Sequence, residues 1–127
     1  AEEAQAAHKD AEFSQAIPIF NVSDLRASQA YYRDTLGFQV NWEDGDPPDF
    51  TSVSRGHAIY FLCEGCQGTP GAWSMVFVRN VDKLHKEYKR KGAKIRLKPR
   101  NMPWGLREMH VSDLDGNVIR MATAIDD

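Results

Sequence analysis

Residues 16–42, AIPIFNVSDLRASQAYYRDTLGFQVNW, predict a strand, a helix and a second strand in close succession. The apolar run 16–22 is typical of a strand, and Pro18 near its start favours an edge position because proline has no N–H to donate. Ser23 or Asp24 provides an N-cap for a helix over 24–36, and Gly37 provides its end. This unit begins a pattern that the rest of the chain repeats.

The first half continues with a polar loop at 43–49 and two strands. The second half follows the same order, with a helix that Asn80 caps and Gly92 ends. The expected strands are 50–54, 57–63, 73–78, 93–98, 106–112 and 117–123, and the second helix covers 81–92. We therefore expect an α+β fold of two tandem βαβββ modules, about 16–64 and 73–124, forming a curved sheet around a ligand cleft. Residues 1–15 are expected to form a tail outside this domain, which covers 16–124.

Composition excludes several classes of protein. The chain has 127 residues and a formal net charge of −2, with a sequence pI near 6.1. No strong basic field draws it to nucleic acid, and no apolar run approaches the ~20 residues of a membrane helix. We expect a cytoplasmic protein that binds a small molecule. Residues 1–15 have no apolar signal-peptide core, so a processed start, an added remnant and a native helix all remain open.

Cys63 and Cys66 form a single CEGC motif between a strand and the loop QGTPG. A structural zinc site needs four ligands, and a redox CxxC normally opens a helix. The sequence therefore favours free thiols, because a local disulfide would require an oxidising compartment. The role of the pair is left open.

Three stretches resemble the glyoxalase/bleomycin-resistance superfamily, also called the vicinal oxygen chelate fold. They are IPIFNVSDLRASQAYYRDTLGFQV, WSMVFVRNVDKLHKEYKRKGAKI and PWGLREMHVSDLDGNVIRMA. The resemblance covers about residues 16–124, and the VSDL…YYRDTLGF segment and the DLDGN hairpin are specific in combination. It implies tandem βαβββ modules, frequent dimers, and a ligand cleft inside the curved sheet.

The resemblance also places the metal ligands of the enzymes in this family. Those positions correspond to Ile17, Trp73 and Arg120. Ile and Trp offer no lone pair to a divalent cation, and Arg brings a positive charge. His110 and Glu108 alternate onto one strand face, but two ligands fall short of the three that a catalytic site usually has. We expect no metal, no cofactor and no catalytic residue.

The branch most resembled is the bleomycin-resistance type, through the PWG stretch around Trp104, the VFVRNVD segment and Pro18. This branch implies non-catalytic sequestration of a cationic aromatic antibiotic in grooves at a homodimer interface. It also implies exchange of the N-terminal strand between subunits, which a proline in that strand favours.

Aromatic and acidic residues suit such a ligand, because aromatic faces stack on planar rings and attract cations. The candidate ligand-binding residues are Trp42, Glu43, Asp46, Phe50, Tyr60, Trp73 and Trp104. The competing interpretation is that the acidic segment is a solvated loop and the aromatic residues belong to the core. Two other functions stay open: a metal-dependent glyoxalase or dioxygenase of the same fold, and a non-metal relative with an unrelated ligand.

Overall fold

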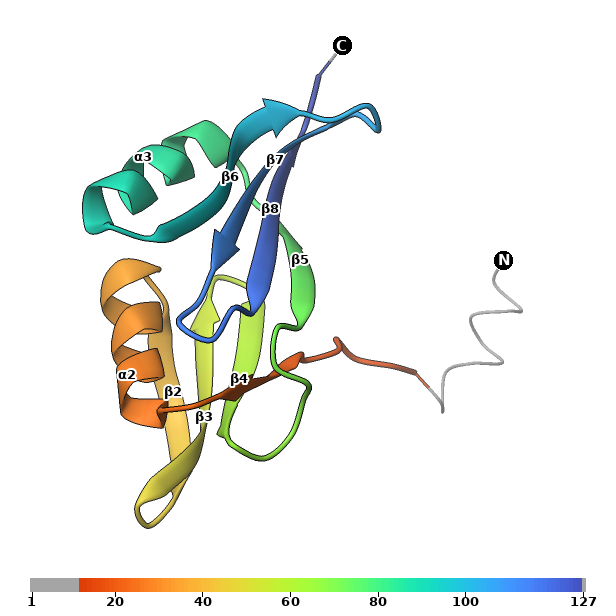
Figure 1. Cartoon of the computed structure of the whole chain (residues 1–127). Coiled ribbons are helices and arrows are strands. Elements are labelled where there is room, and N and C mark those ends of the chain that lie inside the picture. The colour runs from red at the N-terminus through yellow and green to blue at the C-terminus, as the bar shows by residue number, and fades with distance from the viewer. Residues whose placement is uncertain (1–11, 127) are drawn as a thin grey trace.

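The computed structural model describes residues 12–126, which form two four-stranded sheets with a helical segment beside each (Figure 1). The elements of the first half are β1 (Ile19–Val22), α2 (Leu25–Ala30), the π-helix η2 (Tyr31–Thr35), β2 (Gln39–Gly45), β3 (Pro48–Arg55) and β4 (Ala58–Glu64). Those of the second half are β5 (Trp73–Phe77), α3 (Val81–Lys91), β6 (Lys94–Asn101), β7 (Leu106–Ser112) and β8 (Val118–Ala124). The predicted α+β fold of two tandem βαβββ modules is confirmed.

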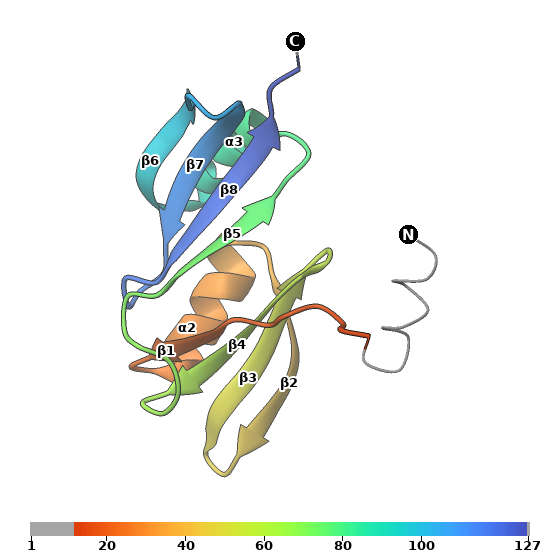
Figure 2. The same ribbon diagram turned by 90° about the vertical axis from the view of Figure 1, so that its right-hand side faces the viewer.

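The two sheets have the same strand order. The first is β1-β4-β3-β2 and the second is β5-β8-β7-β6, with the first strand of each half at an edge (Figure 2). In both sheets this edge strand runs parallel to its neighbour, and the other pairs are antiparallel. The edge position predicted from Pro18 is confirmed, since β1 starts directly after it.

The second helix forms as predicted. The Asn80 side chain accepts a hydrogen bond from the backbone N–H of Lys83, and Gly92 ends the helix with φ of 78°. Lys89, Arg90 and Lys91 occupy its last turn, where cations oppose the partial negative charge of the helix end.

The first helix begins as predicted but widens into a π-helix. Asp24 caps it by accepting from the N–H of Ala27, and the N–H of Leu36 donates to the carbonyl of Tyr31 at its end. The wider turn allows the adjacent Tyr31 and Tyr32 both to be buried. Their hydroxyls donate to the Ser112 carbonyl and to Asp113, at 2.7 and 2.9 Å. The first helical segment is therefore anchored to the second half.

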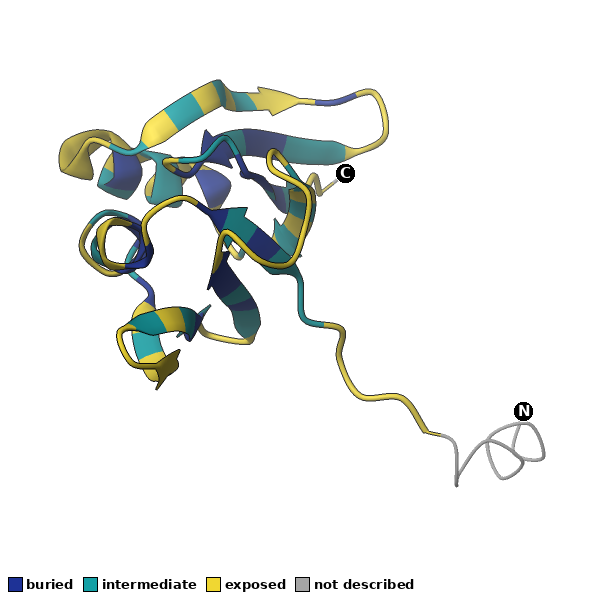
Figure 3. Ribbon diagram, turned by 60° about the horizontal axis from the view of Figure 1, so that its bottom comes forward, coloured by how far each residue is buried: buried dark blue, intermediate teal, exposed yellow. Residues whose placement is uncertain are grey.

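One hydrophobic core joins the two halves on the helix side of the sheets, where the buried segments of Figure 3 meet. Phe20, Leu62 and Tyr32 from the first half belong to the same cluster as Tyr88, Met109 and Ile119 from the second. The carbonyl of Leu36 accepts hydrogen bonds from the Tyr88 hydroxyl (2.7 Å) and the Arg55 guanidinium (2.8 Å). The sheet faces turned away from the helices are called the outer faces below.

Two sequence predictions need correction. The expected loop 43–49 is mostly strand, because β2 extends to Gly45 and β3 begins at Pro48, with Asp44 paired to Phe50. Cys63 and Cys66 are joined as a disulfide rather than free, with their Cα atoms 5.6 Å apart. The end of β4 and the turn after it bring the two side chains together. Predictions about the tail fall largely on residues 1–11, outside the described part. Within residues 12–126, no helix is long and apolar enough to span a bilayer.

Candidate functional site

The outer face of the second sheet exposes large apolar side chains along its edge strand. Successive side chains of a strand point to opposite faces. Val76 packs on the core, so Trp73, Met75 and Phe77 point outward, and all three are exposed. The cross-strand partner of Met75 is Arg120 on β8.

A buried carboxylate forms the centre of this face. Glu108 is 0% exposed. Its carboxylate accepts two hydrogen bonds from Arg120, each 2.9 Å, and one from the indole N–H of Trp104. The Nε2 atom of His110 lies 3.2 Å from the same carboxylate. Burial alone raises the pKa of Glu108, but hydrogen bonds from Trp104, Arg120 and His110 outweigh this and hold the pKa below its ordinary value.

Two indole rings on this face are held by cations. The guanidinium of Arg120 lies 5.9 Å from the Trp104 ring centroid, and that of Arg96 lies 5.4 Å from the Trp73 centroid. The His110 ring packs against Trp73 in an edge arrangement, with 5.6 Å between centroids. The two indoles are nevertheless 58% and 55% exposed. Both indoles thus contact neighbouring side chains, and both residues remain more than half exposed.

The outer face of the first sheet carries a second aromatic group. Trp42 and Phe50 stack at 5.9 Å between centroids, with an angle of 12° between their planes. Phe61 lies 5.2 Å from Trp42 and 5.4 Å from Phe50 and completes the cluster. The sequence-based set omitted Phe61. Strand alternation was the available signal, because its neighbours Tyr60 and Leu62 both point into the core.

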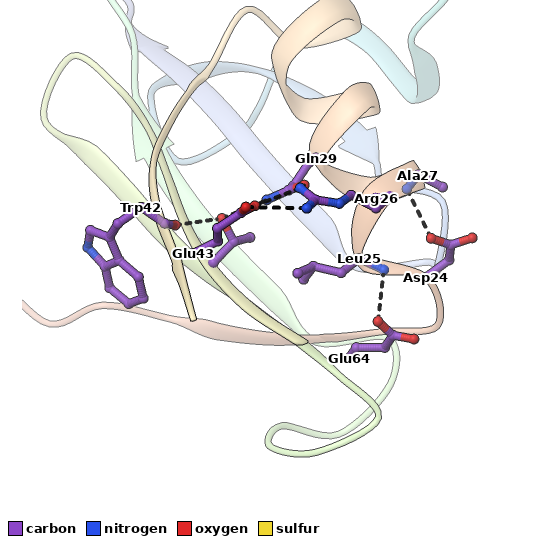
Figure 4. A network of polar contacts seen from close by, with 9 residues as sticks. Asp24, Leu25, Arg26, Ala27, Gln29, Trp42, Glu43 and Glu64 are labelled. Carbon is purple, nitrogen blue, oxygen red and sulfur yellow. Dashed lines mark hydrogen bonds and ion pairs between the residues drawn. The ribbon is translucent and has the colours of Figure 1, made fainter. Parts of the chain in front are cut away.

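The predicted acidic residues near this cluster have different environments. Glu43 accepts hydrogen bonds from Arg26 at 2.6 and 3.3 Å and from Gln29 at 2.9 Å (Figure 4). The hydrogen bonds from Gln29 and Arg26 lower its pKa, so it is an ionised carboxylate already paired within the chain. Asp46, in contrast, is exposed in the β2–β3 turn, and Asp44 and Asp49 are exposed beside it.

Tyr60 was predicted to line the cleft, and the structure places it in the core instead. Its side chain is 3% exposed, and its ring stacks on Phe20 at 5.1 Å. The hydroxyl is 2.8 Å from the Ser74 hydroxyl, across the boundary between the halves. An alternating strand buries one face, and Tyr60 lies on that face.

The remaining predicted residues form two groups rather than one. Trp42 and Phe50 lie on the first outer face, and Trp73 and Trp104 lie on the second. Within residues 12–126, no aromatic pair joins the two groups. The two groups therefore make no direct aromatic contact with each other in the described part of the chain.

The positions at which the family binds metal do not suit a metal here. Trp73 and Arg120 share the second outer face with His110, while Ile17 precedes β1. An indole, a guanidinium and an alkyl chain are not ligands for a divalent cation. Among the described residues, no group of three or more His, Cys, Asp or Glu could hold one. Arg120 instead forms the ion pair with Glu108.

Comparison with family models settles the family. The model described as "Glyoxalase superfamily protein" matches residues 1–127. The chain belongs to the glyoxalase superfamily. No curated protein sequence gives a significant match to this superfamily member.

Several solved structures share the fold of this domain. TioX from Micromonospora sp. ML1 has a TM-score of 0.77 at 20% identity, over 89% of this chain and all (100%) of that one. The bleomycin resistance determinant of transposon Tn5 has a TM-score of 0.75 at 19% identity, over 88% and 98% of the two chains. The bleomycin-binding protein of the bleomycin producer Streptomyces verticillus, solved with copper(II)-bleomycin, has a TM-score of 0.73 at 26% identity, over 91% and 98%.

Proposed function

We propose that this glyoxalase-superfamily domain is a non-catalytic binding protein that sequesters a planar aromatic small molecule carrying a cationic group, such as a bleomycin-family antibiotic. The observation that carries the proposal is the pair of half-exposed indoles: Trp73 contacts Arg96 and His110, and the Trp104 indole donates to Glu108. Ordered aromatic surfaces bind planar rings with little loss of side-chain entropy.

The charges of the two outer faces suggest how such a ligand is oriented. Arginines already lie over the second-face indoles, so that face suits neutral rings rather than a cation. The first face offers the Trp42–Phe50 stack with exposed Asp44, Asp46 and Asp49 nearby in the chain. A cationic group would be favoured there by aromatic faces and by the field of the carboxylates.

A complete groove needs both faces, and we propose that a homodimer supplies them. The two aromatic groups of one chain lie on separate outer faces, so a second copy can place its second face opposite the first face of its partner. Exchange of the N-terminal strand is the proposed means, since residues 12–15 are exposed ahead of Pro18 and β1. A cytoplasmic location remains part of this proposal, and thiol labelling of the expressed protein tests it, because the Cys63–Cys66 disulfide would favour an oxidising compartment.

The test is a tryptophan fluorescence titration with metal-free bleomycin and with copper(II)-bleomycin. We expect saturable quenching at one or two sites per dimer, and a rise in melting temperature by mass action. Light scattering gives the oligomeric state in the same buffer. Saturating drug with neither quenching nor a thermal shift would exclude the antibiotic and leave a superfamily member with an unrelated ligand.

The metal-enzyme alternative predicts that the purified protein carries Zn²⁺, Ni²⁺, Fe²⁺ or Mn²⁺, or is stabilised by one of them. Elemental analysis and thermal-shift assays with each ion test this directly. A stoichiometric metal, or a specific stabilisation by one ion, would contradict the binding-protein proposal.

A further inference from the structure

The last two strands of each half are joined by a connection, and the connection is longer in the second half than in the first. A cavity lies beside the shorter connection. The β7–β8 connection runs from Asp113 to Asn117, whereas β3 and β4 are joined only through Gly56 and His57. The two sheets have the same strand order, so these connections are equivalent. The longer one contacts Ser23 beside the start of the first helix, and the shorter one lines a cavity together with Asn80 and Lys83 at the start of α3.

The long β7–β8 hairpin places the Asp115 carboxylate beside the start of the first helix. Asp115 accepts a 3.0 Å hydrogen bond from the N–H of Ser23, immediately before the cap of the first helix. Asn117 donates to the Asn21 carbonyl at 3.1 Å and fixes the hairpin against β1. At this end an acidic side chain from the second half meets the helix start of the first.

The short hairpin leaves a cavity of about 650 Å³ at the equivalent place. Its apolar lining comes from both halves and includes Phe38, Val76, Leu84 and Tyr88. Ligand pockets typically have volumes of roughly 300–1,000 Å³ and combine apolar walls with a few polar groups. None of the residues predicted for the proposed function lines this cavity.

The polar lining of the cavity has an excess of positive charge. Arg55 is neutralised by Glu87 through hydrogen bonds of 2.7 and 3.0 Å. Arg79 and Lys83 also line the cavity at the start of α3, together with His57 in the hairpin. Within residues 12–126, neither Arg79 nor Lys83 forms an ion pair.

We propose that this cavity is a second ligand site, separate from the outer faces, for a small amphiphilic anion with one carboxylate or phosphate and an apolar body. The acidic group lies beside Arg79 and Lys83, in the role that Asp115 plays at the other end of the molecule. The apolar body packs between Leu84 and the walls of Phe38 and Val76. Removal of apolar surface from water provides affinity, and the cations select the charge.

The experiment compares decanoate with decan-1-ol and decylammonium, using isothermal titration calorimetry and ¹H–¹⁵N chemical-shift mapping on the full chain. Decanoate is expected to bind in preference to the other two and to shift the amides of residues 55–58 and 78–84. Equal binding of decanol, or shifts confined to the outer faces, would overturn the proposal. The absence of binding would also overturn it. So would a dimer, detected by light scattering, in which amide hydrogen exchange shows residues 78–84 protected by the interface.

Matched variants test whether decanoate binding depends on the residues that line the cavity. The double change Arg79→Gln and Lys83→Gln is expected to raise the decanoate Kd about tenfold, whereas Lys89→Gln with Arg90→Gln, at the far end of the same helix, leaves it unchanged. Leu84→Trp fills the cavity and is expected to abolish binding while the circular dichroism spectrum is retained. Trp104→Ala keeps decanoate binding, so failure of this proposal is distinguishable from failure of the proposed function. An unchanged decanoate Kd in the Arg79→Gln and Lys83→Gln double variant would contradict the proposed cavity site.

Discussion

The two halves of this domain have the same strand order but differ in the charged residues that accompany their outer-face aromatic groups. The first half combines the Trp42–Phe50 stack with exposed aspartates in and beside the β2–β3 turn, and in the second half an arginine lies near each indole. Helix-side packing preserves the repeated fold, since both halves contribute to one core. Outer-face residues are free of that constraint, so duplicated modules can acquire different binding chemistry without a change in architecture.

The largest expected effect on stability is at Asp113, in the longer β7–β8 connection, compared with His57 in the shorter β3–β4 connection. The buried Asp113 carboxylate accepts hydrogen bonds of 2.9 Å from the Tyr32 hydroxyl, the Asn117 side chain and two backbone N–H groups. Asp113→Ala leaves these donors buried without partners and is expected to lower the free energy of unfolding by about 3–4 kcal/mol. Urea denaturation measures the loss. His57→Ala, in the equivalent short hairpin, is expected to change it by less than about 0.5 kcal/mol, and equal losses would contradict the comparison.

The second prediction concerns the charged network of the second outer face. Glu108→Gln weakens the pair with Arg120, whose side chain is 32% exposed and keeps some hydration. We expect a loss of about 2 kcal/mol at neutral pH.

The same variant should alter the pH dependence of stability. The folded-state pKa of Glu108 lies below the ordinary 4.5, so its contribution is present above that value and is lost as pH falls through the lower folded-state pKa. Denaturation midpoints are measured in steps from neutral pH into the acid range. The midpoint should fall less on acidification in the variant than in the wild-type protein. Parallel pH curves would show that Glu108 does not titrate in this way.

The third prediction compares the aromatic groups as ligand contacts. Trp104→Ala is expected to weaken bleomycin binding about tenfold, because loss of a central aromatic contact costs more than about 1 kcal/mol. Trp42→Ala is the matched change on the first face, and its effect should depend more strongly on salt if the nearby aspartates bind a cation. Collapse of the fold in Trp104→Ala, seen by circular dichroism, would place this residue in a structural role.

The smallest effect is expected at Glu43, whose pair with Arg26 is exposed to solvent. Glu43→Gln should leave the melting temperature nearly unchanged, because exposed ion pairs contribute little to stability. It should also leave drug affinity nearly unchanged, since this carboxylate is already paired within the chain. A strong loss of drug affinity, measured by the same fluorescence titration, would show that Glu43 contributes to the ligand site.

Local patterns predicted the fold because each element carries its own boundary signal. Asn80 and Gly92 mark the ends of α3, and strand alternation marks β7 over the predicted residues. The 43–49 segment was misread because its polar residues resemble a loop, whereas strand pairing across the sheet determines its conformation.

The candidate site was less predictable, because it depends on which face each strand turns to the core. Tyr60 and Phe61 are adjacent and equally aromatic, but one is buried in the core and the other joins the outer cluster. The Glu108 network joins residues from β7, β8 and the β6–β7 turn, and only the packed sheet brings them together.

The carbonyl of Leu36, at the end of the first helical segment, accepts from Arg55 of its own half and from Tyr88 of the other. Unfolding of either half alone would remove a partner from this contact and expose part of the core that the halves share. We therefore expect the repeated modules to unfold as one cooperative unit, with amide hydrogen exchange giving their core strands the same opening free energy. On that expectation the two repeats form a single thermodynamic domain.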